Sequence, residues 1–153
     1  MDVRLVQVDA LLLEAILPLI EDYQRFYKMT PHRERNRLFF LQLVQEPKTG
    51  TQFAAIEGSD RAVGFATLYF VPSSLSAVRS CILNDLFVVE NSRGKGVGRM
   101  LIDHCRRFAL AAGFSTLEWM TQRQNETAQR LYDGYPVKKS EWFAYELPTQ
   151  GSP

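Results

Sequence analysis

The stretch "LFVVENSRGKGVGRML", from Leu86 to Leu101, decides the fold of this chain. It begins with apolar residues, continues with three alternating glycines among basic residues, and ends where a helical pattern starts. A helix N-terminus carries N–H groups without intrahelical partners and a partial positive charge, and glycine lets the backbone approach a ligand closely. The stretch therefore predicts a strand–loop–helix unit whose loop binds a phosphate or pyrophosphate.

The spacing of the glycines excludes two common phosphate-binding loops. A nucleoside-triphosphate loop requires Lys-Ser or Lys-Thr after its last glycine, and neither pair occurs here. A dinucleotide loop that starts at Gly94 requires a third glycine where Arg99 stands. The pattern that remains is R-x-x-G-x-G, formed by Arg93, Gly96 and Gly98, and a plain surface turn before a helix is the alternative.

The residues on either side of the loop predict regular elements. Residues 78–89 are apolar for most of their length, which indicates a strand buried on both faces and central in its sheet. After the loop, Val97, Leu101, Cys105 and Phe108 recur at helical spacing, and Gly113 closes this amphipathic helix.

The rest of the chain predicts strands and helices in a mixed order. Pro18 interrupts the first helix and predicts a kink or a division there. Strands are expected at 3–8, 52–58, 62–71 and 115–121 with one or two more at 137–147, and helices at 12–27, at 35–45 and after Asn125. Hairpins followed by a strand–helix–strand crossover predict an α/β (α+β) fold with one mixed sheet and helices on its faces.

Composition narrows the class of protein. With 18 basic and 17 acidic residues the net charge is +1, which argues against a nucleic-acid partner. The first residues lack the pattern of a signal peptide, and no apolar run is long enough for a membrane helix, so a cytoplasmic protein is expected. Cys81 and Cys105 are predicted to be reduced, buried thiols, and His32 and His104 lack metal-ligand spacing, so no metal site is expected.

Three segments together resemble the GNAT family of N-acetyltransferases. They are "NDLFV" before the loop, the R-x-x-G-x-G loop itself, and "NETAQRLY" from Asn125 to Tyr132, which resembles the family's N-x-x-A-x-x-[LF]-Y segment. The resemblance extends over about residues 3–147, and within the family it is nearest to the histone and polyamine branch. It implies a GNAT fold with a largely antiparallel sheet of six to seven strands and about four helices. It also implies a single domain over residues 1–148, with a frayed tail at 149–153.

The resemblance implies that acetyl-coenzyme A (acetyl-CoA) is held by the loop and its flanks. In the family, the backbone of the strand before the loop, here with Leu86, lies along the cofactor and its side chains belong to the core. The cofactor-binding residues that it implies are Phe87, Val88, Val89, Arg93, Gly94, Lys95, Gly96, Val97, Gly98, Arg99, Asn125, Ala128 and Tyr132. For Asn125, a helix N-cap is an equal alternative that does not exclude contact with the cofactor.

Acetyl transfer from a thioester to an amine needs a neutral amine, donors for the oxyanion and a proton for the leaving thiolate. Tyr132 lies where the family places a tyrosine beside the thioester sulfur, so the resemblance implies that it is the general acid. A phenol has an ordinary pKa near 10 and a thiol about 8.5, so a tyrosine is protonated at neutral pH and can still donate. Simple helix packing is the alternative reading of Tyr132.

The general base is less defined by the sequence. Polyamine acetyltransferases carry Glu-Asp where this chain has Asn84-Asp85, so the first carboxylate is missing. Adjacent strand residues are expected to face opposite ways, so Asp85 cannot simply replace it. Asp85 could bind or deprotonate the amine, or it could cap a backbone group. Glu118 and an ordered water are the other candidates for the general base. Asn84, Asp85 and Tyr27 are the predicted substrate-binding residues, although aromatic residues at this helical spacing are more often core.

The expected activity is N-acetyl transfer from acetyl-CoA to a small amine, a polyamine or a lysine side chain by direct attack in a ternary complex. A non-catalytic acyl-CoA-binding regulatory domain is the second hypothesis, and the missing carboxylate at Asn84 favours it slightly. A pure protein-interaction module is the third. Homodimers are frequent in the family, so a homodimer is expected, with neither a nucleic acid nor a membrane as partner.

Overall fold

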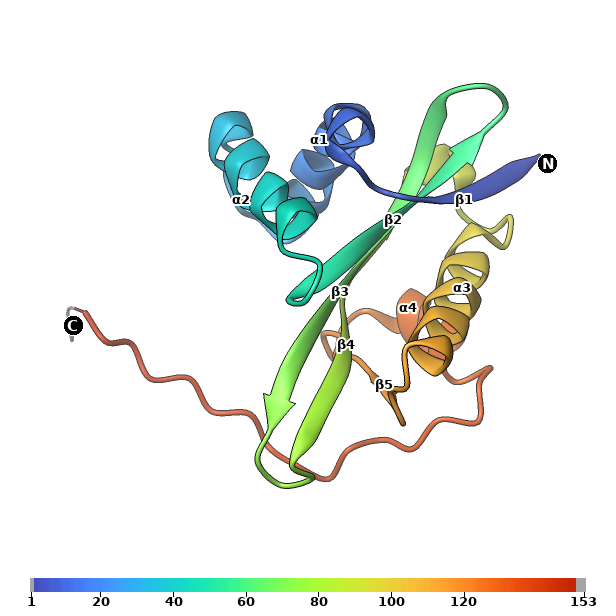
Figure 1. Ribbon diagram of the computed structural model, residues 1–153. Coiled ribbons are helices and arrows are strands. Elements are labelled where there is room, and N and C mark those ends of the chain that lie inside the picture. The colour runs from blue at the N-terminus through green and yellow to red at the C-terminus, as the bar shows by residue number, and fades with distance from the viewer. Residues whose placement is uncertain (1, 151–153) are drawn as a thin grey trace. The chain divides into compact units, whose positions relative to one another are not determined.

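The computed structural model describes residues 2–150, which form two compact units. The first unit ends at Met120 and the second begins at Thr121. The first holds one five-stranded sheet with α1, α2 and α3, and the second holds α4 (Figure 1). Within residues 2–150, none of the helices is long and apolar enough to span a membrane.

The helices and strands agree closely with the sequence prediction up to the end of α3. Pro18 lies within α1, which continues past it as one helix and is therefore not divided. The elements are β1 (Val3–Gln7), α1 (Ala10–Phe26), α2 (Arg33–Gln45), β2 (Gly50–Glu57), β3 (Arg61–Ser73), β4 (Val78–Val88), the 3-10 helix η1 (Glu90–Ser92), α3 (Val97–Ala111), β5 (Leu117–Glu118) and α4 (Glu126–Tyr132).

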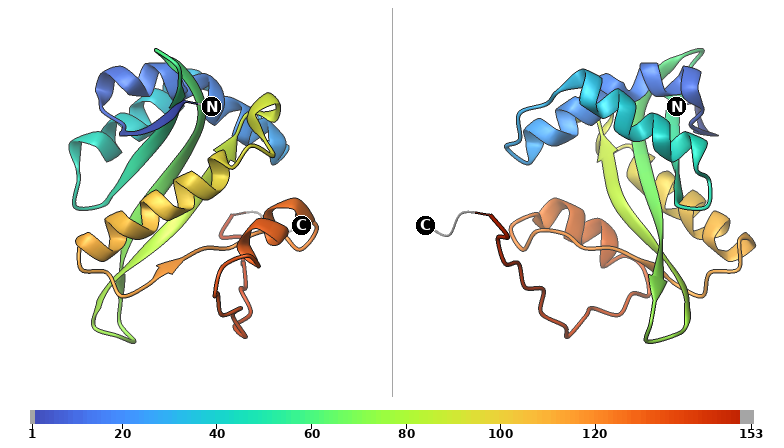
Figure 2. Two further views of the ribbon diagram at one scale, coloured as in Figure 1. Left: turned by 90° about the vertical axis from the view of Figure 1, so that its right-hand side faces the viewer. Right: turned by 60° about the vertical axis from the view of Figure 1, so that its left-hand side comes forward.

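The sheet of the first unit has the strand order β1-β2-β3-β4-β5. The first four strands are antiparallel neighbours, and β5 pairs with β4 in parallel after the crossover through α3. Helices α1 and α2 cover one face of the sheet and α3 covers the other (Figures 1 and 2). The predicted mixed sheet, with β4 inside it, is confirmed. The expected six to seven strands are not, because the described residues form a sheet of five.

Two of the predicted strands differ from the structure. The strand expected at 115–121 is reduced to Leu117–Glu118, which pair with Cys81 and Ile82. Residues 137–147, predicted as one or two strands, form no strand. The side chain of Trp142 within this segment is largely exposed, at 85%. A strand needs a neighbouring edge for its backbone hydrogen bonds. Within residues 121–150 the only regular element is α4, so this unit offers the segment no such edge.

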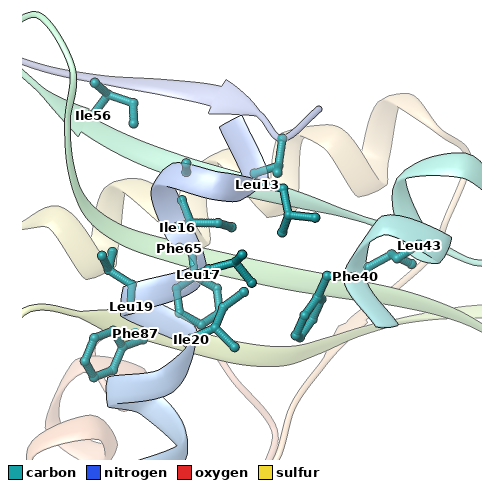
Figure 3. Packing of buried hydrophobic residues seen from close by; sticks show 12 residues of the cluster. Leu13, Ile16, Leu17, Leu19, Ile20, Phe40, Leu43, Ile56, Phe65 and Phe87 are labelled. Carbon is teal, nitrogen blue, oxygen red and sulfur yellow. The ribbon is translucent and has the colours of Figure 1, made fainter. Parts of the chain in front are cut away.

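The core of the first unit lies between α1 and the sheet. Leu13, Ile16, Leu17 and Ile20 form the buried stripe of α1, and they pack with Phe65 of β3 and its neighbours (Figure 3). The stripe follows the helical spacing of three and four residues, which is the pattern expected of a helix that covers a sheet. This packing fixes α1 over β3 and β4, where the candidate site is found.

Truncation of Leu17 to alanine is expected to lower the free energy of unfolding by about 2 to 5 kcal/mol, because the side chain is fully buried. Leu11→Ala on the same helix is the matched control, since Leu11 is 83% exposed. That change is expected to stay within about 0.5 kcal/mol of wild type. Urea unfolding of both variants measures the difference, and equal losses would contradict the described packing.

The two cysteines are free and buried, as predicted. Burial raises the pKa of the Cys81 thiol to about 11 and that of Cys105 to about 12. Both groups are therefore protonated at neutral pH and behave as small apolar side chains.

Candidate active site

The glycine loop forms the turn between β4 and α3. Gly94 and Gly96 have φ angles of +71° and +85°, a left-handed conformation that favours glycine, and Gly96 is the N-cap of α3 without a side-chain cap. A Cβ atom added at either glycine would meet nothing within 4 Å. The N-terminus of α3 is therefore open for a ligand to approach, as the sequence predicts.

The side chain of Arg93 faces back onto the protein. Its Nε donates to the carbonyl oxygen of Val88 at 2.9 Å. Its guanidinium carbon lies 5.9 Å from the ring centroid of Phe26 and 5.7 Å from that of Phe87, within cation–π range. Arg93 therefore holds the loop against α1 and β4. The contribution of its charge to phosphate binding stays a prediction.

The other loop residues divide by exposure. Lys95 and Arg99 are exposed, whereas Val97 is buried and belongs to the core. Phe87 is also buried, and its ring packs against Tyr23 with 6.2 Å between the centroids. The prediction that side chains of the strand before the loop are ordinary core is confirmed for Phe87.

Strand β4 contains a bulge at Asn84. Leu83 pairs with Leu68 of β3 and Asp85 pairs with Thr67, so Asn84 is the extra residue. β5 pairs with β4 only at Cys81 and Ile82, just before the bulge. A bulge bends its strand, and the pairing of β4 with β5 ends just before this one. Beyond Ile82, the described part of β5 provides no ladder partner for the β4 backbone.

The bulge also exchanges the faces of β4. Cys81 lies near Cys105 of α3, whereas Phe87 packs against Tyr23 of α1. In a regular strand, residues separated by an even number of positions lie on one face. The bulge places Asp85 on the α1 face together with Phe87, and Asn84 Nδ2 donates to Asp85 Oδ1 at 3.0 Å. The prediction that regular alternation separates the side chains of Asn84 and Asp85 is wrong.

Asp85 is the titratable group at the centre of this arrangement. It is 6% exposed and accepts hydrogen bonds from Thr67, Tyr23 and Asn84. Burial raises the pKa of the Asp85 carboxyl above its usual range, although the three hydrogen bonds lower it. A buried carboxyl of this kind is suited to accept a proton.

Further polar residues that sequence reasoning missed surround Asp85. Thr67 is fully buried and accepts from Gln52 Nε2 at 2.9 Å. Burial and the Asp85 carboxylate raise the pKa of Tyr69 to about 12. The only signal in the sequence was polar residues within apolar strands, and the pairing of the strands could not be read from it.

Aromatic residues at the end of α1 lie beside this group. Tyr23 and Tyr27 meet edge to face with ring centroids 5.0 Å apart, and Phe26 meets Tyr27 at 5.1 Å. Because Tyr23 also bonds to Asp85, the structure brings Tyr27, Asn84 and Asp85, the three predicted substrate residues, into one neighbourhood.

The second unit holds the remaining predicted residues. Asn125 Oδ1 accepts from the backbone N–H of Ala128 at 3.2 Å, so Asn125 is the N-cap of α4, as one alternative predicted. Tyr132 is the last residue of α4. The cofactor and acid roles of Asn125, Ala128 and Tyr132 stay predictions.

Glu118 and the two histidines lie apart from the group around Asp85 in the contacts that the structure describes. Glu118 is exposed and accepts from the Thr116 hydroxyl at 3.0 Å. His32 caps α2, and His104 packs against Phe53 at 4.5 Å while burial lowers its pKa. Among residues 2–150, no group of three or more histidine, cysteine or acidic side chains could hold a metal ion.

The chain was compared with known proteins. The model of the acetyltransferase (GNAT) family matches residues 16–135. The N-acetyltransferase YhfO of Bacillus subtilis (strain 168) is 33% identical over 131 residues, which cover 86% of this chain and 87% of YhfO. The D-amino-acid N-acetyltransferase HPA3 of Saccharomyces cerevisiae (strain ATCC 204508 / S288c) is 32% identical over 120 residues, which cover 78% of this chain and 74% of HPA3.

A solved structure agrees with these relatives. The crystal structure of a probable acetyltransferase is 30% identical, covers 97% of this chain and 99% of its own, and has a TM-score of 0.86. The family model spans most of the chain and includes β4, the glycine loop and α4. The chain therefore belongs to the GNAT family of acetyltransferases.

Proposed function

We propose that this acetyltransferase moves the acetyl group of acetyl-CoA to a primary amine by direct attack in a ternary complex. The observation that carries the proposal is the arrangement of β4 and the loop after it. The strand bears the buried Asp85 on the α1 face, and the loop ends at the open N-terminus of α3. A proton acceptor and a binding site for a phosphate group thus belong to one continuous strand–loop–helix unit.

The loop residues fit the phosphate part of acetyl-CoA. The backbone N–H groups at the start of α3 would bind the pyrophosphate, because glycines leave the approach open. Lys95 and Arg99, which are exposed, would add positive charge. When bound, acetyl-CoA supplies an activated thioester.

Asp85 and Tyr132 would each transfer one proton during the reaction. Asp85 takes the proton of the attacking ammonium, so the nitrogen lone pair becomes available for the bond to the acetyl carbon. As the carbon–sulfur bond breaks, the nitrogen would lose its second proton to solvent and Tyr132 would give its phenolic proton to the sulfur. Tyr132 would then recover a proton from solvent. Leu86, Phe87 and Val88 would contribute backbone groups to the oxyanion and the pantetheine arm. Their strand pairs with β3 on one side, but the described part of β5 gives them no ladder partner on the other.

The acceptor that we propose is a small amine, a polyamine or a lysine side chain. The aromatic group of Tyr23, Phe26 and Tyr27 beside Asp85 suits an alkylammonium, which combines a cation with an apolar chain. The relative HPA3 is named as a D-amino-acid N-acetyltransferase, so free amino acids belong in the same screen.

Release of free thiol from acetyl-CoA, measured with an amine panel, tests the proposal. The panel contains alkylamines, polyamines, lysine peptides and D-amino acids, and amine-dependent release is expected for at least one class. Matched tertiary amines, which cannot form an amide, are the control and are expected to give only background hydrolysis. Tight coenzyme A binding without turnover of any amine would contradict the proposal and favour a regulatory acyl-CoA-binding domain.

A homodimer is the proposed assembly, on the family resemblance alone. Light scattering of the purified protein measures the mass directly, and the mass of a single 17.6 kDa chain would contradict it.

A further inference from the structure

A row of three polar side chains crosses the otherwise apolar face of the sheet beneath α1. The row contains Gln52 of β2, Thr67 of β3 and Asp85 of β4. Gln52 is the register partner of Thr67, and Thr67 is the register partner of Asp85. The three residues are 2%, 0% and 6% exposed, so water does not satisfy them freely and they depend on one another.

The hydrogen bonds in this row have one direction. Gln52 Nε2 donates to Thr67 Oγ1 at 2.9 Å. The hydroxyl of Thr67 has a single hydrogen, and Thr67 in turn bonds to Asp85, whose carboxylate only accepts. The reverse orientation of the Gln52 amide would present an oxygen to Thr67 and draw that hydrogen away from Asp85.

We propose that Gln52 and Thr67 are positioning residues for Asp85. Gln52 fixes the rotation of the Thr67 hydroxyl, and the hydroxyl holds Asp85 as the carboxylate that receives the amine proton. The inference rests on the proposed function for the catalytic role of Asp85, but the effect on Asp85 itself is a property of the protein without substrate.

The three buried polar side chains are energetically unfavourable in an apolar core, which supports a role in positioning Asp85. Gln52 Oε1 is buried without a hydrogen-bond partner among the described residues, which is unfavourable. Gln52 also lines a cavity of about 30 Å³ between β2 and the end of α2, together with Leu43, Val44 and Pro47. An apolar pair in place of Gln52 and Thr67 would avoid these demands, so packing alone does not explain the polar row.

Few other groups act on Asp85. From α1 it faces the Tyr23 hydroxyl, from β3 Thr67 and Tyr69, and from β4 the Asn84 amide. No cation is among the groups that shift the pKa of Asp85, so hydrogen bonds alone oppose the effect of burial. Among them the bond from Thr67 lowers the pKa of Asp85 the most. Loss of the Thr67 donor therefore favours the protonated carboxyl.

The test is the titration of Asp85 by carbon-13 NMR of its carboxyl, assigned with Asp85→Asn. Thr67→Val keeps the size of the side chain and removes the donor, and it is expected to raise the titration midpoint by about one pH unit. Gln52→Met is expected to raise it by less, because the freed hydroxyl still bonds to Asp85 part of the time. Thr67→Ser is expected to stay near wild type.

Thr51→Val is the matched control. Thr51 is also a buried threonine of the sheet, but its hydroxyl accepts from Gln7 Nε2 at 3.0 Å. Its replacement is expected to leave the midpoint unchanged. An unmoved midpoint in Thr67→Val, or an equal shift in Thr51→Val, would overturn the inference.

The pH profile of kcat separates this inference from the proposed function. The base acts as a carboxylate, so kcat falls as pH falls through the pKa of Asp85. A higher pKa in Thr67→Val then moves the acid limb of the profile to higher pH by the same amount as the NMR midpoint. A shifted midpoint with an unmoved acid limb of kcat would reject Asp85 as the base and leave the positioning of its carboxyl established. A shifted midpoint in a protein whose wild type turns over no amine would reject the proposed function and likewise leave the positioning established.

Discussion

Replacement of Gly96 by valine is expected to abolish the binding of coenzyme A. Gly96 has a φ of +85° at the N-cap of α3, and a β-branched residue adopts this conformation only with strain. The valine side chain would also project into the open space in front of the helix, where the proposed pyrophosphate site lies. Together these effects are expected to cost about 3 kcal/mol or more, which corresponds to at least roughly a hundredfold in Kd.

Gly58→Val provides the control for strain alone. Gly58 lies in the turn between β2 and β3, has a φ of +62°, and likewise has nothing within 4 Å of an added Cβ atom. This variant is expected to lose stability but to retain its affinity for coenzyme A. Calorimetric titration of both variants measures the contrast, and full affinity in Gly96→Val would remove the loop from the cofactor site.

Replacement of Tyr132 by phenylalanine is expected to lower kcat by about 10²- to 10⁴-fold, which is the usual contribution of a general acid. The change removes one oxygen atom from the end of α4 and retains the ring. The Kd for coenzyme A is expected to stay within about threefold of wild type, because the phosphate contacts belong to other residues. Steady-state rates together with calorimetry measure the two quantities separately.

Tyr135→Phe is the matched control for Tyr132→Phe. Tyr135 follows α4 closely in the same unit, and no catalytic role is proposed for it. Its replacement is expected to leave kcat nearly unchanged. If Tyr132→Phe also retains full turnover, Tyr132 is a packing residue of α4 and the leaving thiolate takes its proton from elsewhere.

Local patterns in the sequence predicted most elements of the first unit. The spacing of Val97, Leu101 and Cys105 predicted α3, and all three side chains are buried. The glycine spacing predicted an open loop, and Gly96 has the required left-handed conformation. These predictions hold because each depends on residues close together in the chain, where backbone preferences and helical periodicity act directly.

Features that depend on pairing between distant residues were not predicted. The alternation in residues 137–147 resembled a strand, but a strand also requires an edge to pair with, and Phe143 and Tyr145 are 75% and 94% exposed in the structure. The partners of Asp85 were missed for the same reason, since Thr67 and Gln52 reach it only through the register of three strands. A sequence pattern does not state the register of a sheet.

The extra residue in β4 ties the proposed chemistry to the folding of the domain. Asn84 shifts the phase of the strand, so that Leu83 before it is buried against one layer and Phe87 after it packs into the other. Loss of that single residue would turn Asp85 and Phe87 together toward the opposite layer. A chain that lacks Asn84 would therefore misfold rather than fold into an inactive enzyme. The packing of the core and the position of the Asp85 carboxylate depend on the same residue.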